Sequence, residues 1–268
     1  MKTNTDIRPS PLAGRWYPSQ PDKLAESIDN YIHSAQIPEI KGEILALVSP
    51  HAGHIYSGPV AGHAFKSIQD LNPELIVILS PFHQYHPDAI LTSGHQAYQT
   101  PLGEVPVDRE IAELVNISLR DKTGIELSEV HNDGEHAIEI KMPFLKRALK
   151  GNFAVLPLML RQQDPGLMKA LGEILSGLIE SQNTLLVAST DLSHFYPESK
   201  AKQFDREMLH QFSIFSPQGV LAAERSGRGF ACGAGAAAAV LWTAKHYHAD
   251  TVKILHHSTS ADAVSYTH

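Results

Sequence analysis

The sequence predicts a single α/β domain over residues 1–268, with a mostly parallel central sheet covered by helices on both faces. The stretches 43–49, 74–80 and 184–190 each have an uninterrupted apolar centre, which is typical of strands that are buried on both faces. Segments with helical spacing separate these runs, and this alternation is the pattern of parallel α/β folds. We find no internal repeat, linker or low-complexity tract, so one domain accounts for the whole chain.

The individual elements follow in order after an irregular, proline-rich start. Predicted helices cover about 22–35, 58–70, 135–149, 164–181 and 234–248, with one more from about residue 108 and two between 190 and 229. Pro143 is expected to kink the third of these helices. Predicted strands cover 43–49, 74–80, 89–92, 153–160, 184–190 and 251–255. The internal Pro157 favours an edge or bulged position for the strand 153–160.

Composition excludes several classes of partner. The chain has 22 basic and 29 acidic residues and a net charge of -7, with no basic stripe, so we expect no nucleic-acid partner. No apolar run reaches the ~18 residues of a membrane span, and no signal-peptide pattern opens the chain, so we expect no membrane association. A single cysteine is typical of a reducing compartment, and the expected location is cytoplasmic.

Polar residues follow each of the three clearest strands. His51 and His83 come just after the first two, and Asp191 and His194 come just after the third. In open α/β sheets, ligands bind beyond the carboxyl ends of the strands. If the strands are parallel, these four side chains converge at one edge of the sheet. The alternative is that the histidines are ordinary loop residues and that Asp191 caps a helix.

Cys232 is the only cysteine, and it lies in the glycine-rich stretch 229–235. It could be a small buried apolar residue, a nucleophile or a metal ligand. A position near a helix N-terminus favours the thiolate, which is the form that binds metal. Two imidazoles and one thiolate would make a three-ligand site with open positions, as catalytic metals require. Such ligands suit Fe(II), Zn(II) or copper better than Mg²⁺ or Ca²⁺.

Glu135 and His136 begin the predicted helix 135–149. Neighbouring helical residues point to different sides, so the two are not expected to face one metal together. His136 could instead donate a hydrogen bond near the site or transfer a proton; the alternative is a solvated residue at the start of a helix.

Several of these segments, in order over nearly the whole chain, resemble the Memo family, whose prokaryotic members are called AmmeMemoRadiSam system protein B. The matching segments are Arg8-Pro9, Ala13 to Pro18, Pro50 to Gly53, Tyr56 to Gly58, Ser80 to His83, Thr100 to Gly103, Glu135 to Glu139, Pro143 to Leu145, Asp191 to His194, and Cys232-Gly233.

The resemblance implies a fold similar to the LigB-type class III extradiol dioxygenases, with a non-haem metal held by His51, His83 and Cys232. Cysteine replaces the carboxylate ligand of those dioxygenases, which weakens the expectation of ring cleavage. The resemblance also implies a pocket that includes Trp16 and Tyr56 as substrate-binding residues. The expected catalytic residues are His194, Asp191 and His136, with Asp191 steering His194.

The predicted function is iron- or copper-dependent redox activity on a small substrate or an oxygen species. Fe(II) is the first choice of metal, and copper or Zn(II) are alternatives. A second hypothesis is a non-catalytic protein that binds a metal or a peptide and acts with partners; the resemblance implies AMMECR-type and radical-SAM proteins. Zinc-dependent hydrolysis with His194 as the base, and nucleophilic attack by Cys232, are further alternatives.

Overall fold

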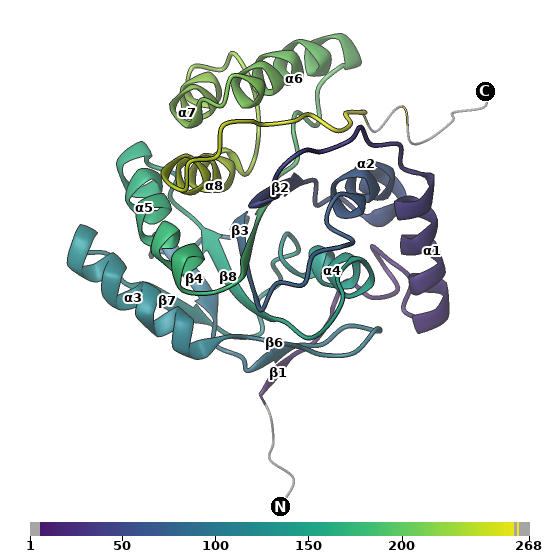
Figure 1. The fold of residues 1–268 in the computed structure, drawn as a ribbon, viewed down its shortest axis with the longest axis horizontal. Coiled ribbons are helices and arrows are strands. Elements are labelled where there is room, and N and C mark those ends of the chain that lie inside the picture. Colours follow the sequence, from purple (N-terminus) through teal and green to yellow (C-terminus); the bar gives the residue numbers. More distant parts are fainter. Residues whose placement is uncertain (1–5, 260–261, 263–268) are drawn as a thin grey trace, which may run out of the picture.

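A six-stranded sheet forms the centre of the computed structural model, which describes residues 6–259 and residue 262 (Figure 1). Its strands lie in the order β2-β9-β3-β8-β4-β7, and four of the five ladders between them are parallel. Only β4 and β8 pair in antiparallel fashion. The strands are β2 (Ala46–Ser49), β3 (Leu75–Pro81), β4 (Ile90–Ser93), β7 (Leu127–Val130), β8 (Ala154–Leu160) and β9 (Thr184–Ser189). The α/β prediction is therefore confirmed.

Helices cover both faces of this sheet (Figure 1). One face packs against α3 (Arg109–Thr123), α5 (Pro165–Ser181) and α8 (Ala234–His246). Outside α8 lie α7 (Pro217–Arg225) and then α6 (Glu198–Ser213) (Figure 1). The other face packs against α1 (Pro21–Ser34), α2 (His54–Lys66) and α4 (Met142–Ala148), which follows the short 3-10 helix η1 (Glu139–Lys141). In the described part of the chain, no helix is both long and apolar enough to cross a bilayer.

Strand β3 shows why the apolar runs lack alternation. Leu75, Val77 and Leu79 belong to the core beneath α5 and α8, whereas Ile76 and Ile78 belong to the core beneath α1 and α2. Both faces of the strand are thus buried in hydrocarbon. A small second sheet of β1 (Ile7–Arg8), β5 (Ala97–Tyr98) and β6 (Val105–Pro106) joins the N-terminal segment to the molecule.

The prediction of an edge position for the strand 153–160 is wrong. Strand β8 lies between β3 and β4. Pro157 is tolerated there because the ladder to β4 includes only Met159 and Leu160, so the missing N–H interrupts no bond on that side. The Pro157 carbonyl instead accepts a hydrogen bond from the hydroxyl of Thr92 at 2.7 Å.

Two other element predictions are also wrong. Residues 135–138 form a loop, and helical structure begins only at η1, so Pro143 sits in the first turn of α4 instead of kinking a longer helix. Residues 251–255 are not a strand: β2, the nearest strand edge, pairs with β9, and Lys253 bonds to the carbonyl of Glu39 at 2.6 Å.

Candidate metal centre

Sheet order explains how distant residues meet. Strands β2, β9 and β3 are neighbours and run parallel, so their carboxyl ends lie side by side. His51 stands two residues after β2, Asp191 two residues after β9, and His83 two residues after β3. The sequence-based expectation that these residues converge at one edge of the sheet agrees with the structure.

Three imidazole rings cluster at this edge. One ring nitrogen from each of His51, His83 and His136 lies within 4.8 Å of the other two. The ring centroids are 5.3 Å apart for His51 and His83, 5.2 Å for His51 and His136, and 4.5 Å for His83 and His136. His51 is buried, whereas His83 is partly open to solvent. This group could hold a metal ion and leave positions open for other ligands.

Hydrogen bonds fix which nitrogen each ring presents. The Ser189 hydroxyl donates to the carbonyl of Ala137 at 2.7 Å, so its oxygen accepts from Nδ1 of His51 at 3.0 Å. A carboxylate can only accept, so Nδ1 of His83 donates to Glu135 at 3.0 Å. Nδ1 of His136 lies 3.3 Å from the same carboxylate oxygen. The rings of His51 and His83 are thus held through Nδ1, which leaves their Nε2 atoms as the candidate ligand atoms.

Glu135 organises the loop that carries His136. Besides His83, its carboxylate accepts the backbone N–H groups of His136 at 2.8 Å and Ala137 at 2.9 Å. These bonds replace the helical ones, which is why the residues form a loop. The helix assumed for Glu135 and His136 is absent, and both residues lie at the site, but only His136 is among the groups that could hold a metal.

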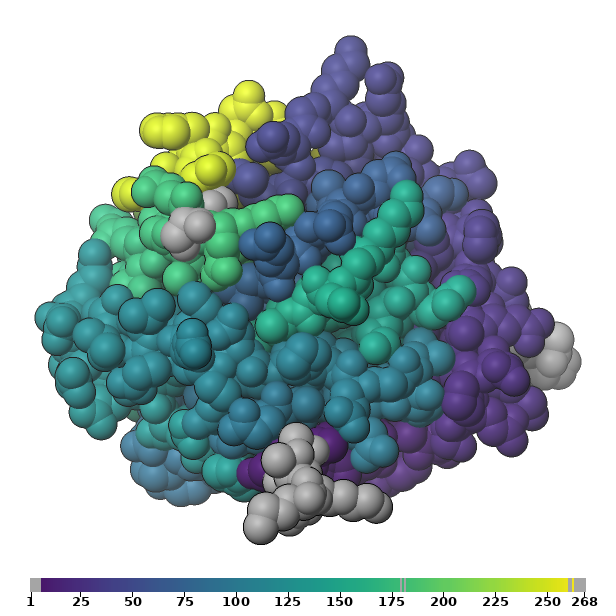
Figure 2. Space-filling model, turned by 60° about the horizontal axis from the view of Figure 1, so that its bottom comes forward, coloured from purple at the N-terminus to yellow at the C-terminus, as the bar shows by residue number. Residues whose placement is uncertain are grey.

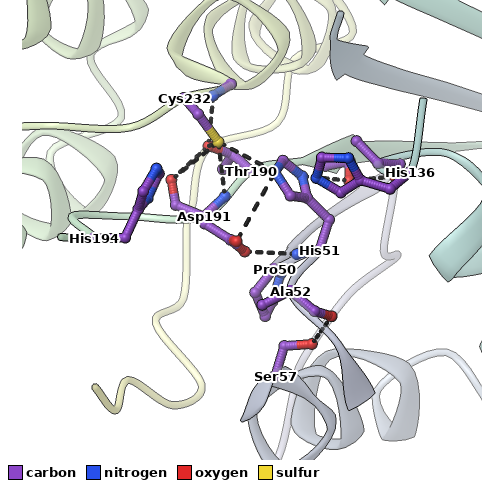
Figure 3. A network of polar contacts seen from close by, with 12 residues as sticks. Pro50, His51, Ala52, Ser57, His136, Thr190, Asp191, His194 and Cys232 are labelled. Carbon is purple, nitrogen blue, oxygen red and sulfur yellow. Dashed lines mark hydrogen bonds and ion pairs between the residues drawn. The ribbon is translucent and has the colours of Figure 1, made fainter. Parts of the chain in front are cut away.

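Cys232 adjoins the histidine cluster (Figure 3). Its sulfur lies 3.2 Å from Nε2 of His51 and accepts the backbone N–H of Asp191 at 3.3 Å. The thiol thus stands at the site instead of being enclosed by hydrocarbon. Gly233 makes this approach possible, because a Cβ there would lie 2.5 Å from the carbonyl oxygen of Ser189.

Asp191 and His194 differ in how they relate to the site. The Asp191 carboxylate accepts the backbone N–H of His51 at 2.6 Å, and its other oxygen lies 3.9 Å from Nε2 of His51. Nδ1 of His194 bonds instead to the carbonyl of Leu192 at 2.9 Å. In Figure 3, His194 lies on the far side of Asp191 from His136. Asp191 therefore orients His51. Among the described contacts, no hydrogen bond joins Asp191 to His194, so the expected orientation of His194 by Asp191 stays a prediction.

The two expected substrate-binding residues lie in different places. The Trp16 ring packs against His136, with centroids 4.7 Å apart, so it borders the cluster. Tyr56, in the first turn of α2, is half exposed and lines a cavity beside β2 that also includes Asp191 and His194 but none of the three clustered histidines. Among the described contacts, none joins Tyr56 to the histidines.

The electrostatic environment differs between the rings of the cluster: it favours the neutral forms of His51 and His136 and the protonated form of His83. Burial, followed by the charge of Lys141, lowers the pKa of His51 well below 6.5, which keeps this ring in the neutral form that binds metal. Burial opposes protonation of His83, but hydrogen bonds to Cys232 and Glu135 raise its pKa to about 10. Burial also opposes ionisation of Glu135, yet the bonds from His83 lower its pKa to about 2. A positive charge is thus stabilised between the sulfur and the carboxylate. The donor set and this field both fit a divalent metal.

Sequence reasoning missed two residues behind the site. Glu135 was visible as the neighbour of His136 in a segment shared with the Memo family, but its role needs the loop geometry. No motif or spacing in the sequence pointed to a role for Lys141. Its side chain is buried, and its ammonium group donates to the carbonyl of Pro50 and to the hydroxyl of Ser49. Burial lowers the pKa of Lys141 to about 7, against the attraction of Asp191 and Cys232.

Arg8 ties the N-terminal segment to the loop of Glu135. The buried guanidinium bonds to Asp133 at 3.0 Å, to Glu139 at 2.8 Å and to the carbonyl of Glu135 at 2.8 Å. Tyr17 adds a hydrogen bond to Glu139 at 2.7 Å. Figure 2 shows the N-terminal part of the chain (purple) lying directly against the middle part (teal).

Comparisons with known proteins find relatives over nearly the whole chain. A family model described as "Memo-like protein" matches residues 8–268. A "MEMO1 family protein" of Nitrosopumilus maritimus is 33% identical, over 97% of this chain and 95% of its own length. A second, from Methanopyrus kandleri, is 30% identical over 94% of this chain and 91% of its own. Among solved structures, an uncharacterised protein of Escherichia coli matches with 16% identity and a TM-score of 0.49, covering 67% of this chain and 81% of its own.

Proposed function

Because this chain belongs to the Memo family, we propose that His51, His83 and Cys232 hold a redox-active metal ion and that the protein acts on a small substrate or an oxygen species. Fe(II) is the first choice of metal, copper the second and Zn(II) the third, since imidazole and thiolate ligands suit all three. His136 stands beside these ligands as a fourth group that could bind the metal or the substrate.

One observation carries the proposal. Nδ1 of His51 and of His83 are hydrogen-bonded to oxygen, Nδ1 of His136 lies 3.3 Å from Glu135, and one nitrogen of each ring lies within 4.8 Å of the other two, beside the sulfur of Cys232. Outer hydrogen bonds of this kind orient metal ligands in known sites. Three histidines with such oxygen contacts at one edge of a sheet are more typical of a metal site than of surface residues.

The protein's own groups have distinct roles in this proposal. A bound iron or copper ion would supply electron transfer to or from dioxygen or the substrate. Asp191 fixes the backbone of His51, and Glu135 fixes the rings of His83 and His136. His194 lies beyond Asp191 with Nε2 free of described hydrogen bonds, so it is the group proposed to move a proton. Trp16 covers His136 and would contact a substrate.

Anaerobic metal titration followed by measurement of oxygen uptake tests this function. We expect metal-dependent uptake in the presence of a catechol or a simple reductant, and its loss in His194→Ala with the metal still bound. An absence of metal-dependent uptake with every catechol and reductant tried would count against redox activity.

A second candidate function, binding of a peptide or partner protein at the same site, is favoured by exposed aromatic residues. Phe195 is 99% exposed and Tyr85 is 84% exposed, and they follow His194 and His83 closely. Phe195 also has a φ of 65°, a left-handed conformation that is uncommon for its residue type. Stoichiometric co-purification of an AMMECR-type or radical-SAM protein that persists in Cys232→Ser, without turnover, would favour this function over redox activity.

A further inference from the structure

A cavity of about 880 Å³ lies beside β2, which is the edge strand of the central sheet, and Asp191 and His194 lie at its border with the proposed metal site. Residues 43–50 all line one side of it, and residues 249–259 line another. In Figure 1 this C-terminal segment (yellow) passes near β2 without joining the sheet. Its volume is within the range of about 300–1,000 Å³ that is usual for ligand sites.

The segment 249–259 is anchored on both sides of the cavity. Nε2 of His257 bonds to Asp205 of α6 at 2.8 Å, and the ring of His256 stacks on His63 of α2 with centroids 4.1 Å apart. Lys253 bonds to the carbonyl of Glu39. The cavity therefore lies between β2 and a segment, residues 249–259, that side-chain contacts hold in place.

The backbone of β2 offers unpaired groups to this cavity. The carbonyls of Leu45 and Ser49 accept bonds from β9, so the odd-numbered residues of this stretch face β9. In a parallel ladder alternate residues point to opposite sides, so the N–H and C=O groups of Ala46 and Val48 face the cavity. Within the described residues, no backbone bond meets them there. Unpaired strand edges of this kind recruit an added strand.

The walls determine what side chains such a strand would carry. Val60 and Ala64 of α2 line one side of the sheet plane, and Phe212 of α6 and Leu241 of α8 line the other. A strand buried on both faces needs apolar residues at successive positions. An apolar small molecule would fill the volume, but it would leave the backbone groups of Ala46 and Val48 without partners.

Charge at the rim favours basic ends on the occupant. The exposed carboxylates at the rim are Glu39, Glu43 and Asp250, against Lys41 and Lys253, whereas Asp205 is buried and paired with His257 and Asp191 is bonded to His51. From the free edge, the apolar walls and this charge, we infer that the cavity binds an extended apolar segment of a partner polypeptide, flanked by Lys or Arg, which adds to β2 as a further strand.

Hydrogen exchange and peptide binding test this inference. The probe is a fluorescent synthetic peptide, Lys-Val-Ile-Val-Thr-Val-Lys with blocked ends, and the control is the same peptide N-methylated at alternate residues. We expect the unmodified peptide to bind and to slow exchange of the Ala46 and Val48 amides, and the methylated one to bind at least about tenfold more weakly. Val48→Lys should weaken binding similarly, whereas Leu114→Lys, on the distant helix α3, should not.

Three results would overturn the inference. Equal binding of both peptides, or binding of the apolar dye anilinonaphthalene sulfonate without protection of Ala46 and Val48, would identify a site for apolar small molecules. Protection of those amides that grows with protein concentration in the absence of peptide would identify a second copy of this chain as the occupant. No binding of the peptide would leave the cavity without the proposed role. Metal content is measured in parallel and should not change in Val48→Lys, so the outcome is separable from the metal proposal.

Discussion

The carboxylate of Glu135 accepts hydrogen bonds from both the backbone N–H and the ring Nδ1 of His83, at 2.6 Å and 3.0 Å. The same carboxylate accepts the N–H groups of His136 and Ala137. One side chain thus sets the direction of the His83 ring and the path of the His136 loop. It is buried and ionised, because the bonds from His83 outweigh the cost of burial.

Glu135→Gln should therefore weaken metal binding without removing a ligand. A neutral amide holds the His83 ring less firmly and no longer balances its charge, and loss of such a partner typically costs about 10–100-fold in metal affinity. Competition with a chromophoric chelator measures the change. Glu126→Gln is the matched control, since that carboxylate is exposed. Equal affinities in the two variants would show that Glu135 does not position the ligands.

Substitutions of Cys232 and His136 distinguish the two possible ligand sets. With Cu(II) or Co(II) bound, a thiolate ligand gives an intense sulfur-to-metal absorption band. We expect the band in the wild type and in His136→Ala, and its absence in Cys232→Ser. A band that survives in Cys232→Ser would remove sulfur from the ligand set and leave His51, His83 and His136.

Arg8→Met should destabilise the fold strongly. The guanidinium is 1% exposed and neutralises Asp133 and Glu139, whose side chains are 4% and 0% exposed. Removal of one member of a buried ion pair typically costs about 3–5 kcal/mol. Urea denaturation measures the free energy of unfolding. Arg120→Met, which breaks an exposed pair with Glu126, should change it by less than ~1 kcal/mol. Similar small losses in both variants would contradict the role given to Arg8.

Much of the fold and part of the site could be predicted from the sequence. Residues 75–79 and 185–188 are all apolar and all buried, so strand type and a parallel sheet follow from the pattern alone. Since parallel strands end at one edge, the meeting of His51, His83 and Asp191 follows as well. Cys232 reaches the same edge because Gly233, which has no Cβ, allows this segment of backbone to lie close to Ser189 at the end of β9.

Other features depend on contacts between distant segments. Residues 135–138 have a helical pattern, but the Glu135 carboxylate captures the backbone N–H groups that a helix would use. Residues 251–255 have the composition of a strand, but Lys253 bonds to Glu39 and the segment does not join β2. The spacing of Asp191 and His194 in the sequence does not reveal that the His194 ring bonds to the nearby carbonyl of Leu192.

Lys141 should give the metal-free protein a pH-dependent stability. Its pKa is 10.5 in the unfolded chain and about 7 in the folded protein, because burial disfavours the cation. Between these values the unfolded state binds more protons, so the free energy of unfolding rises as pH rises from about 7 towards 10.5. Relative to Lys141→Met, the wild type should gain roughly 3–4 kcal/mol between about pH 7 and about pH 10. Parallel pH profiles of the two proteins would contradict this.

The metal content of protein purified without oxygen tests the central claim most directly. Elemental analysis should find close to one iron or copper ion per chain in the wild type, almost none in His51→Ala or His83→Ala, and wild-type content in His194→Ala. Full occupancy in His51→Ala would contradict the claim that this edge of the sheet holds the metal.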